Sequence, residues 1–225
     1  MYMPQYRHEW KHELNLSDRI AIRQRLRLIA RPDEHTDGGR YLVRSLYFDN
    51  LTDKALREKI DGVNRREKFR IRYYNGDTSV IHLEKKSKLG GLGNKQSAVI
   101  SAPEAEAILH GELDWMMDSG RPLVRELYSK MRTQLLCPRT IVDYTREPYI
   151  YPPGNVRVTM DHGIRTGLDC TAFLEPCVTV PAGEAPIILE VKWDTFLPEI
   201  IRDAIQLEGR RASAFSKYAQ CRIYG

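Results

Sequence analysis

Residues 68–86 read Lys-Phe-Arg-Ile-Arg-Tyr-Tyr-Asn-Gly-Asp-Thr-Ser-Val-Ile-His-Leu-Glu-Lys-Lys, and charged and apolar side chains alternate on both sides of the Asn-Gly pair. Side chains two positions apart lie on one face of a β-strand, so Arg70 and Arg72 share a face and the apolar residues beside them share the other. Asn-Gly between two such runs is a strong signal for a tight turn. The stretch therefore predicts a hairpin of strands 68–74 and 80–86 with one basic face.

The same alternation occurs along the whole chain. With the two arms of the hairpin it occurs in six stretches, and the others are Arg7-Glu9-Lys11-Glu13, Tyr144-Arg146, Arg157-Thr159-Asp161 and Glu190-Lys192. One such strand is ordinary, because half-buried antiparallel strands alternate in this way with the polar face in water. Six of them, mostly carrying Arg or Lys with a few carboxylates, predict a sheet closed around a polyanion.

Length and charge set the limits of this interpretation. A chain of 225 residues is long enough to bury a full core, and its net charge of +5 favours an anionic partner. No apolar run of 18 residues is present, and residues 1–5 do not have the pattern of a signal peptide. The four cysteines show no CxxC spacing. We therefore expect a cytoplasmic protein with reduced thiols and no transmembrane segment of its own.

The remaining patterns predict further strands and peripheral helices. The strands are expected at 5–14, 41–49, 95–101, 140–146, 156–161 and 187–193. Helices are expected from a cap at Ser17 to about 30, at 52–59, after a capping box at Ser101 and Glu104, and at 122–136, 198–208 and 213–221. Eight mostly antiparallel strands with peripheral helices predict an α+β barrel, in one domain over residues 1–225.

One short motif suggests a zinc protease instead. His8-Glu9-Trp10-Lys11-His12 matches HExxH, in which two zinc-binding histidines and a general-base Glu share one face of a helix. Here, however, the charged residues alternate with a period of two, and a strand places Glu9 on the face opposite both histidines. We expect a strand at this position and no zinc site.

The Gly-rich residues 90–97 are only superficially like a phosphate-binding loop. A P-loop needs Gly-Lys-Ser/Thr in direct sequence between a strand and a helix. In this chain Asn94 and Gln96 interrupt that order, and strand-like residues follow. The stretch predicts a flexible hairpin loop.

Taken in order, the motifs resemble the VTC domain, the polyphosphate polymerase branch of the triphosphate tunnel metalloenzymes. The ordered set covers nearly the whole chain and is more specific than any of its members. It comprises Arg7-x-Glu9-x-Lys11, Ser45-Leu-Tyr-Phe-Asp-Asn50, Phe69-Arg-Ile-Arg-Tyr73, Glu84-Lys-Lys86, Lys95-Gln-Ser97, Tyr144-x-Arg146, Arg157-Val-Thr-Met-Asp161, Leu189-Glu-Val-Lys192 and Phe215-Ser-Lys-Tyr218.

The resemblance implies an eight-stranded antiparallel tunnel that binds ATP or polyphosphate with a divalent metal, Mn²⁺ or Mg²⁺. In polymerase members the γ-phosphate of ATP is transferred to a growing polyphosphate chain. Glu190 matches the metal-binding glutamate of the family, Lys95 would lie toward a tunnel mouth, and Tyr144 and Ser216 would add hydroxyl contacts. The residues implied to contact phosphate oxygens are Lys11, Arg70, Arg72, Lys86, Arg146, Arg157 and Lys217.

Two positions depart from the family pattern. Its N-terminal motif is Glu-x-Glu-x-Lys, whereas this chain has Arg7 first and so loses one carboxylate that could bind metal. Some polymerase members also carry a Lys three residues before the position of Lys217, and here that residue is Ala214. Both changes leave phosphate binding intact and put turnover and chain length in question.

The chemistry of the charged residues agrees with the resemblance. Phosphoryl transfer requires mainly positioning and charge neutralisation, so a cage of Arg and Lys with one metal is a sufficient catalyst in principle. Glu9 is interpreted either as a metal ligand or as charge balance, and Glu84 as charge balance. Arg65, Arg66 and Lys68, which precede the Arg70 strand, are interpreted as solvated.

Three functions remain open from the sequence. The first is a polymerase that uses ATP, and the second is a hydrolase of the same fold that releases inorganic phosphate or pyrophosphate from a triphosphate. The third is a non-catalytic module that binds polyphosphate or a nucleotide. Nucleic-acid binding is not expected, because no helix carries a basic stripe. The sequence leaves open whether a membrane protein is a partner.

Overall fold

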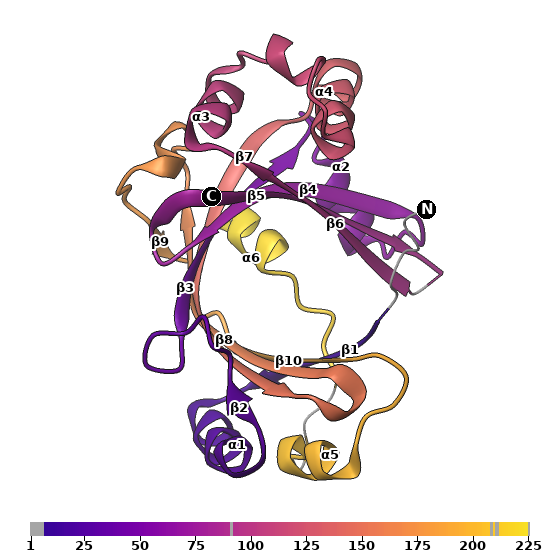
Figure 1. The fold of residues 1–225 in the computed structure, drawn as a ribbon, viewed down its shortest axis with the longest axis vertical. Coiled ribbons are helices and arrows are strands. Elements are labelled where there is room, and N and C mark those ends of the chain that lie inside the picture. Colours follow the sequence, from indigo (N-terminus) through magenta and orange to yellow (C-terminus); the bar gives the residue numbers. More distant parts are fainter. Residues whose placement is uncertain (1–6, 91, 208, 210–211, 225) are drawn as a thin grey trace.

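One antiparallel sheet organises the computed structural model, which describes residues 7–90, 92–207, 209 and 212–224 (Figure 1). The strands follow the order β1-β10-β8-β7-β3-β4-β5-β6, and two short strands pair beside this path, β2 with β7 and β9 with β8. The bounds are β1 His8–Leu14, β2 Arg31–Pro32, β3 Tyr41–Asp49, β4 Arg66–Tyr74, β5 Asp77–Leu89, β6 Leu92–Ile100, β7 Cys137–Tyr151, β8 Val156–Gly167, β9 Val180–Pro181 and β10 Ile187–Trp193.

The sheet curls until its two edge strands approach each other (Figure 1). Neighbouring strands in a sheet are rotated relative to one another, so a path of eight strands does not stay flat. Among the described residues, an isolated bridge joins Arg7, just before the edge strand β1, to Gly93 of the other edge strand, β6. The predicted α+β fold with eight antiparallel strands is confirmed, as a curled sheet.

The β4–β5 hairpin has the turn that its sequence predicts. Asn75 and Gly76 both have positive φ values, of 52° and 74°, as a type I′ turn requires. In the ladder Arg70 lies opposite Glu84, and Lys68 lies opposite Lys86. Both strands are longer than predicted, because the ladder continues to the pair of Arg66 with Lys88.

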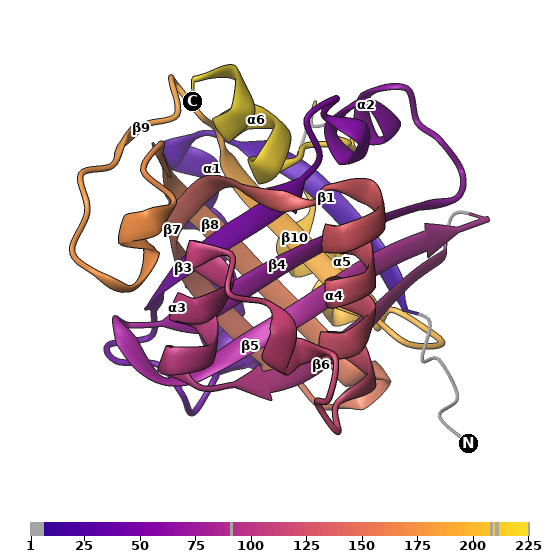
Figure 2. The ribbon, with the colours of Figure 1, turned by 90° about the horizontal axis from the view of Figure 1, so that it is seen from above.

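In the described part of the chain, six α-helices and three 3₁₀ helices accompany the sheet. The α-helices are α1 Leu16–Ile29, α2 Lys54–Ile60, α3 Ala102–His110, α4 Pro122–Gln134, α5 Glu199–Ile205 and α6 Lys217–Ile223, and the 3₁₀ helices are η1 Asp114–Met116, η2 Pro153–Asn155 and η3 Thr171–Leu174. Helices α3 and α4 lie over the outer face of β4, β5 and β6 (Figure 2). Helices α1 and α5 cover the outer face of β8 and β10.

Helix α6 differs from the others because it packs on the inner face of the sheet (Figure 1). Its Tyr218 is buried with Tyr47, Val142 and Tyr144, which come from β3 and β7. The Tyr218 hydroxyl donates a hydrogen bond to Asp49 at 2.6 Å. The C-terminal helix is therefore fixed inside the curl of the sheet.

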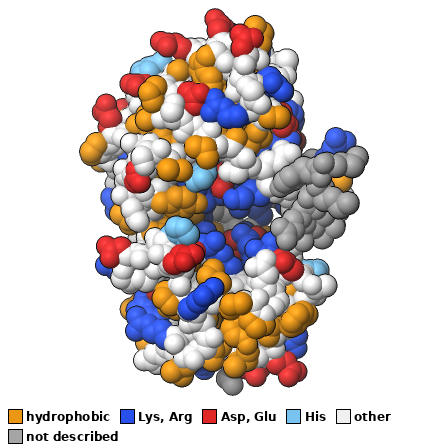
Figure 3. Space-filling view, in the orientation of Figure 1, with side chains coloured by type: hydrophobic (Ala, Val, Ile, Leu, Met, Phe, Trp, Pro, Cys, Tyr) orange, Lys and Arg blue, Asp and Glu red, His pale blue; other side chains and the backbone are white. Residues whose placement is uncertain are grey.

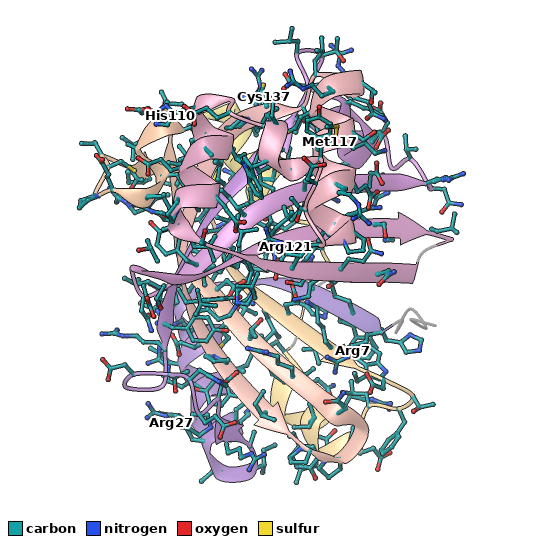
Figure 4. All side chains as sticks on the ribbon, turned by 45° about the horizontal axis from the view of Figure 1, so that its top comes forward. Arg7, Arg27, His110, Met117, Arg121 and Cys137 are labelled. Atoms are coloured by element: carbon teal, nitrogen blue, oxygen red, sulfur yellow. The ribbon has the colours of Figure 1, made fainter. Side chains whose placement is uncertain are left out.

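The helical layer is tied to the sheet edge by Arg121, which immediately precedes α4 (Figure 4). Its guanidinium donates to the Val99 carbonyl of β6 at 2.8 Å and also pairs with Glu104 of α3. Glu104 in turn completes the predicted capping box with Ser101. One residue thus connects α4, α3 and β6.

The start of α1 corrects one prediction. Asn15, not Ser17, is the N-cap: its side-chain oxygen accepts from the Asp18 backbone N–H at 2.8 Å, and the Asp18 carboxylate accepts from the Asn15 N–H at 3.0 Å. This reciprocal pair begins the helix before Ser17 is reached, so Ser17 lies in the first turn.

The ends of other elements also differ from the predictions. Strands β7 and β8 run well beyond 140–146 and 156–161, because they pair with each other from Ile141–Gly167 to Tyr151–Val156. Helix α6 begins after Ser216, which caps it, rather than at Ser213. The predicted start of the first strand, Gln5, and the predicted end of α5, Glu208, lie outside the described residues.

The HExxH residues form strand β1, as their alternation predicts. His8 stacks on Trp193 with ring centroids 5.4 Å apart, whereas the Glu9 carboxylate contacts Lys11 at 2.7 Å and Lys192 at 3.5 Å. The histidine and the glutamate therefore lie on opposite faces, and the zinc-protease arrangement does not form. None of the described helices is both long and apolar enough to cross a bilayer.

Candidate active site in the lumen of the curled sheet

The inner face of the curled sheet encloses a space that we call the lumen. A hollow opens in the middle of the molecule, and Lys and Arg side chains border it (Figure 3). These side chains come from β1, β4, β5, β7 and β10 and from the start of α6. The alternation that the sequence shows is what turns them inward, because the residues between them pack into the outer cores.

Arg70 is held between a carboxylate and a phenol. Its guanidinium donates to Glu84 at 2.7 Å and to the Tyr47 hydroxyl at 2.8 Å. Glu84 also accepts from Lys95 at 3.0 Å. Burial opposes the charge on Glu84, but Arg70 and Arg72 hold its pKa well below the usual value. Glu84 is therefore the charge-balancing carboxylate that the sequence suggested, and it fixes two predicted phosphate ligands.

Arg72 has only neutral partners among the described residues. It donates to the Ser45 hydroxyl and to the Tyr144 hydroxyl, both at 2.9 Å, and its side chain is almost fully buried. The predicted Tyr144 thus lies in the cluster and helps to orient a guanidinium. Because no carboxylate among the described residues contacts Arg72 directly, its guanidinium remains available to an anion.

Asp161 joins two of the predicted cations. This fully buried carboxylate accepts two hydrogen bonds from Arg146, each of 2.7 Å, and contacts the Lys217 ammonium at 2.7 Å. Burial opposes its charge, but Arg146 and Lys217 lower its pKa below the usual value. Ser216, the residue before Lys217, caps α6 by accepting from the Ala219 N–H at 3.3 Å.

The neighbouring strands β1 and β10 contribute two carboxylates and two lysines. Lys11 contacts Glu9 at 2.7 Å and Glu190 at 3.5 Å, and Lys192 pairs with both carboxylates. Burial opposes the charge on Glu190, yet Lys192 and Lys11 hold its pKa well below the usual value. Glu190 is therefore negatively charged at neutral pH.

Lys86 completes the lumen from β5. Burial, together with the charges of Arg70 and Lys192, lowers its pKa well below that of a free lysine. Glu190 and Lys11 also act on this pKa, so β5 and the β1–β10 pair are close enough to interact across the lumen. No carboxylate contacts Lys86 within the described part of the chain.

Two predicted ligands lie nearer the edge of the site. The Lys95 side chain, which the resemblance would place toward a tunnel mouth, is 54% exposed. Arg157 is 36% exposed and donates to Asp33 and to the Tyr41 hydroxyl, both at 2.9 Å. The side chains of Lys95 and Arg157 are therefore more exposed than those of the other predicted cations that pair with the buried carboxylates.

The structure also identifies inner residues that the sequence interpretation missed. Tyr47 binds Arg70, and Asp161 holds two cations, although neither had been assigned a role. Lys68, interpreted as solvated, lies instead on the inner face, 5.3 Å from the Tyr47 ring centroid. The signal for Lys68 was present, because it belongs to the same alternation as Arg70 and Arg72.

The model of the VTC domain family matches residues 6–224. The chain belongs to the VTC domain family. This match confirms the resemblance seen in the sequence. No curated protein matches the chain.

Two solved structures from Pyrococcus horikoshii resemble this VTC domain. The PH1012 protein has a TM-score of 0.50 and 13% identity, over 94% of this chain and 96% of that one. The PH1819 protein has a TM-score of 0.45 and 14% identity, over 89% of this chain and 84% of that one. At such identities the likeness concerns the fold alone.

Proposed function

We propose that this VTC domain is a metal-dependent polyphosphate polymerase that transfers the γ-phosphate of ATP to a growing polyphosphate chain. The observation that carries the proposal is the convergence of buried Arg70 and Arg72 and partly buried Arg146 on one lumen with a buried carboxylate, Glu190. Arg72 and Lys86 contact no carboxylate among the described residues, and neighbouring cations repel both of them unless an anion lies close by. A chain of phosphates supplies that anion.

The proposed reaction needs little covalent chemistry from the protein. A terminal phosphate oxygen of the chain attacks the γ-phosphorus of ATP, the bond from that phosphorus to the β–γ bridging oxygen breaks, and ADP leaves with the electron pair. The lumen cations align both phosphate groups and neutralise the charge that develops. Arginine grips phosphate with two hydrogen bonds, whereas lysine acts as a movable point charge, and the mixture suits a polymer that slides.

The carboxylates Glu190 and Glu9 fit a divalent metal such as Mn²⁺ or Mg²⁺. Among the described residues no cluster of three or more metal-binding side chains occurs, but these two carboxylates lie on paired strands and share Lys11 and Lys192. Mg²⁺ typically takes one or two protein carboxylates and completes its shell with water and phosphate oxygens. When bound, the metal would supply additional neutralisation of the phosphate charge.

The two departures from the family pattern, Arg7 and Ala214, each change one side chain and leave the predicted lumen cations in place. Arg7 adds no carboxylate, and its guanidinium forms an ion pair with Asp194 at 2.7 Å. Where some family members have a lysine before α6, this chain has Ala214. Lys217, at the start of α6, is retained and contacts Asp161. We expect both changes to affect the rate and the product length more than binding.

The proposal is tested by incubating the purified protein with ATP and Mn²⁺ and analysing the products. Long polyphosphate together with ADP supports a polymerase. Free phosphate or pyrophosphate without polymer instead assigns the lumen to hydrolysis of triphosphate. Binding of tripolyphosphate without turnover of ATP assigns it to a non-catalytic module.

Glu190→Gln is the informative variant for this assay. We expect turnover to fall by about 100-fold, the usual scale for loss of one charge-stabilising group. Without metal, binding of tripolyphosphate should not weaken, because the change removes a negative charge beside Lys11 and Lys192. Glu199→Gln, on the first turn of α5, is the matched control and should leave both measurements unchanged.

A further inference from the structure

Most lumen cations are neutralised by a buried carboxylate. The pairs are Arg70 and Lys95 with Glu84, Lys11 and Lys192 with Glu190, and Arg146 and Lys217 with Asp161. Within the described part of the chain, Lys68, Lys86 and Arg72 face the lumen without such a partner. Lys86 and Arg72 already belong to the proposed phosphate site, whereas Lys68 does not.

Lys68 sits over a pair of stacked aromatic rings. Its ammonium lies 5.3 Å from the ring centroid of Tyr47 and 6.0 Å from that of Tyr218, and the two centroids are 5.0 Å apart. The Tyr218 hydroxyl is fixed by Asp49, whose carboxylate also accepts from the backbone N–H groups of Ala55 and Leu56 in the first turn of α2. Ring faces attract a cation but do not neutralise its charge.

The electrostatic environment of Lys68 leaves its charge in need of an anion. Burial lowers the pKa of Lys68 to about 8. Tyr47, whose own pKa is lowered to about 7 by the cations Arg70, Lys68 and Arg72, opposes this shift, while Arg70, Lys11 and Lys59 add to it. Lys86 faces it across the β4–β5 ladder, and Tyr218 faces it from α6. A desolvated cation without a carboxylate costs folding free energy, and that cost is offset when an anion binds.

We propose that Lys68 is a further phosphate-binding residue, which extends the lumen site past Arg70 toward α2 and α6. Residues two apart on a strand are separated by about 6.6 Å, so Lys68, Arg70 and Arg72 offer successive contacts along an extended anion. The extended site therefore favours a chain of phosphates over a single phosphate group. This inference rests on the proposed function, since it concerns the same lumen.

The proposal is tested with Lys68→Met, which removes the ammonium and keeps the aliphatic stem over the rings. Calorimetric titration with tripolyphosphate, without metal, should give about ten-fold weaker binding, equivalent to about 1.4 kcal/mol. Binding of orthophosphate should change by less than about two-fold. Lys54→Met removes the same charge from the exposed face of α2, where Lys54 lies 3.8 Å from Glu58, and it should bind like the wild type.

A structural role for Lys68 predicts different results. If the lysine served to hold Tyr47 and Tyr218 together, Lys68→Met would lower the melting temperature of the ligand-free protein. If Lys68 is a phosphate ligand, Lys68→Met should leave the melting temperature of the ligand-free protein unchanged or raise it. Lys68→Arg should then restore most of the affinity for tripolyphosphate. Wild-type affinity in Lys68→Met, or a lower melting temperature with no rescue by arginine, overturns the inference.

The outcomes also separate this inference from the proposed function. If Arg70→Ala weakens tripolyphosphate binding and Lys68→Met does not, the inference about Lys68 fails and the lumen site stands. If both variants weaken binding but the wild type makes no polyphosphate from ATP, the polymerase proposal fails and Lys68 remains a phosphate ligand.

Discussion

At the scale of single residues, buried carboxylates determine how the lumen cations are arranged. Asp161 is the clearest case, because a fully buried carboxylate holds Arg146 and Lys217 together. Asp161→Asn should destabilise the protein by about 3–5 kcal/mol, since it leaves buried cations without a counter-charge. Urea denaturation measures this loss. Asp143→Asn, which breaks a partly exposed pair with Arg44, should cost much less. Equal losses would contradict the assigned role of Asp161.

The pH dependence of stability provides a second test at the residue scale. The pKa of Lys68 is lowered to about 8 in the folded protein, below the usual value of about 10.4 for an unfolded lysine. The resulting penalty is fully present below pH 8 and disappears as the pH rises toward 10.4. The stability advantage of Lys68→Met over the wild type should therefore shrink across this range. An advantage that does not change with pH would show that Lys68 is not desolvated.

Sequence alternation predicted which residues face inward but not which residues pair. Arg70, Arg72 and Glu190 follow directly from the period of two, because that period is a property of one strand. The partners of Arg146 depend on the register between strands and on α6, and that register cannot be read from one strand. The interpretation of Lys68 as solvated is wrong, because its position two residues before Arg70 puts it on the inner face of the same strand.

At the scale of secondary-structure elements, the start of α1 offers a matched pair of variants. Asn15→Ala should cost about 1 kcal/mol, because it removes the side-chain oxygen that accepts from the Asp18 N–H. Ser17→Ala should be close to neutral, since Ser17 lies inside the first turn. Thermal unfolding of both variants measures the difference. A larger loss for Ser17→Ala would contradict the observed cap.

Elements with strong local signals were predicted closely, and those defined by distant partners were not. Strands β3 and β10 have the predicted bounds, and the Asn75-Gly76 turn is where the sequence places it. Strands β7 and β8 exceed their predicted bounds because each is extended by pairing with the other. Strand length here is a property of the ladder rather than of the local sequence.

At the scale of the whole molecule, the curled sheet concentrates cations that an open sheet would separate. Among the described residues, an isolated bridge between Arg7, just before β1, and Gly93 of β6 links the two edges of the sheet, and the inner cations border the space that the sheet encloses. An anion that binds only the folded protein stabilises it by about 2.7 kcal/mol at one hundred times its dissociation constant. Screening of charges by salt depends on ionic strength, so two salts at the same ionic strength should stabilise the protein equally if screening is the only effect.

The central claim, that the lumen binds a chain of phosphates, is tested most directly by melting temperatures in tripolyphosphate and in chloride at matched ionic strength. We expect tripolyphosphate to raise the melting temperature of the wild type much more than chloride does. The double variant Arg70→Ala, Arg72→Ala should lose most of that gain. Equal shifts in the two salts for the wild type would contradict the claim, because they would mean that these cations do not form a specific phosphate site.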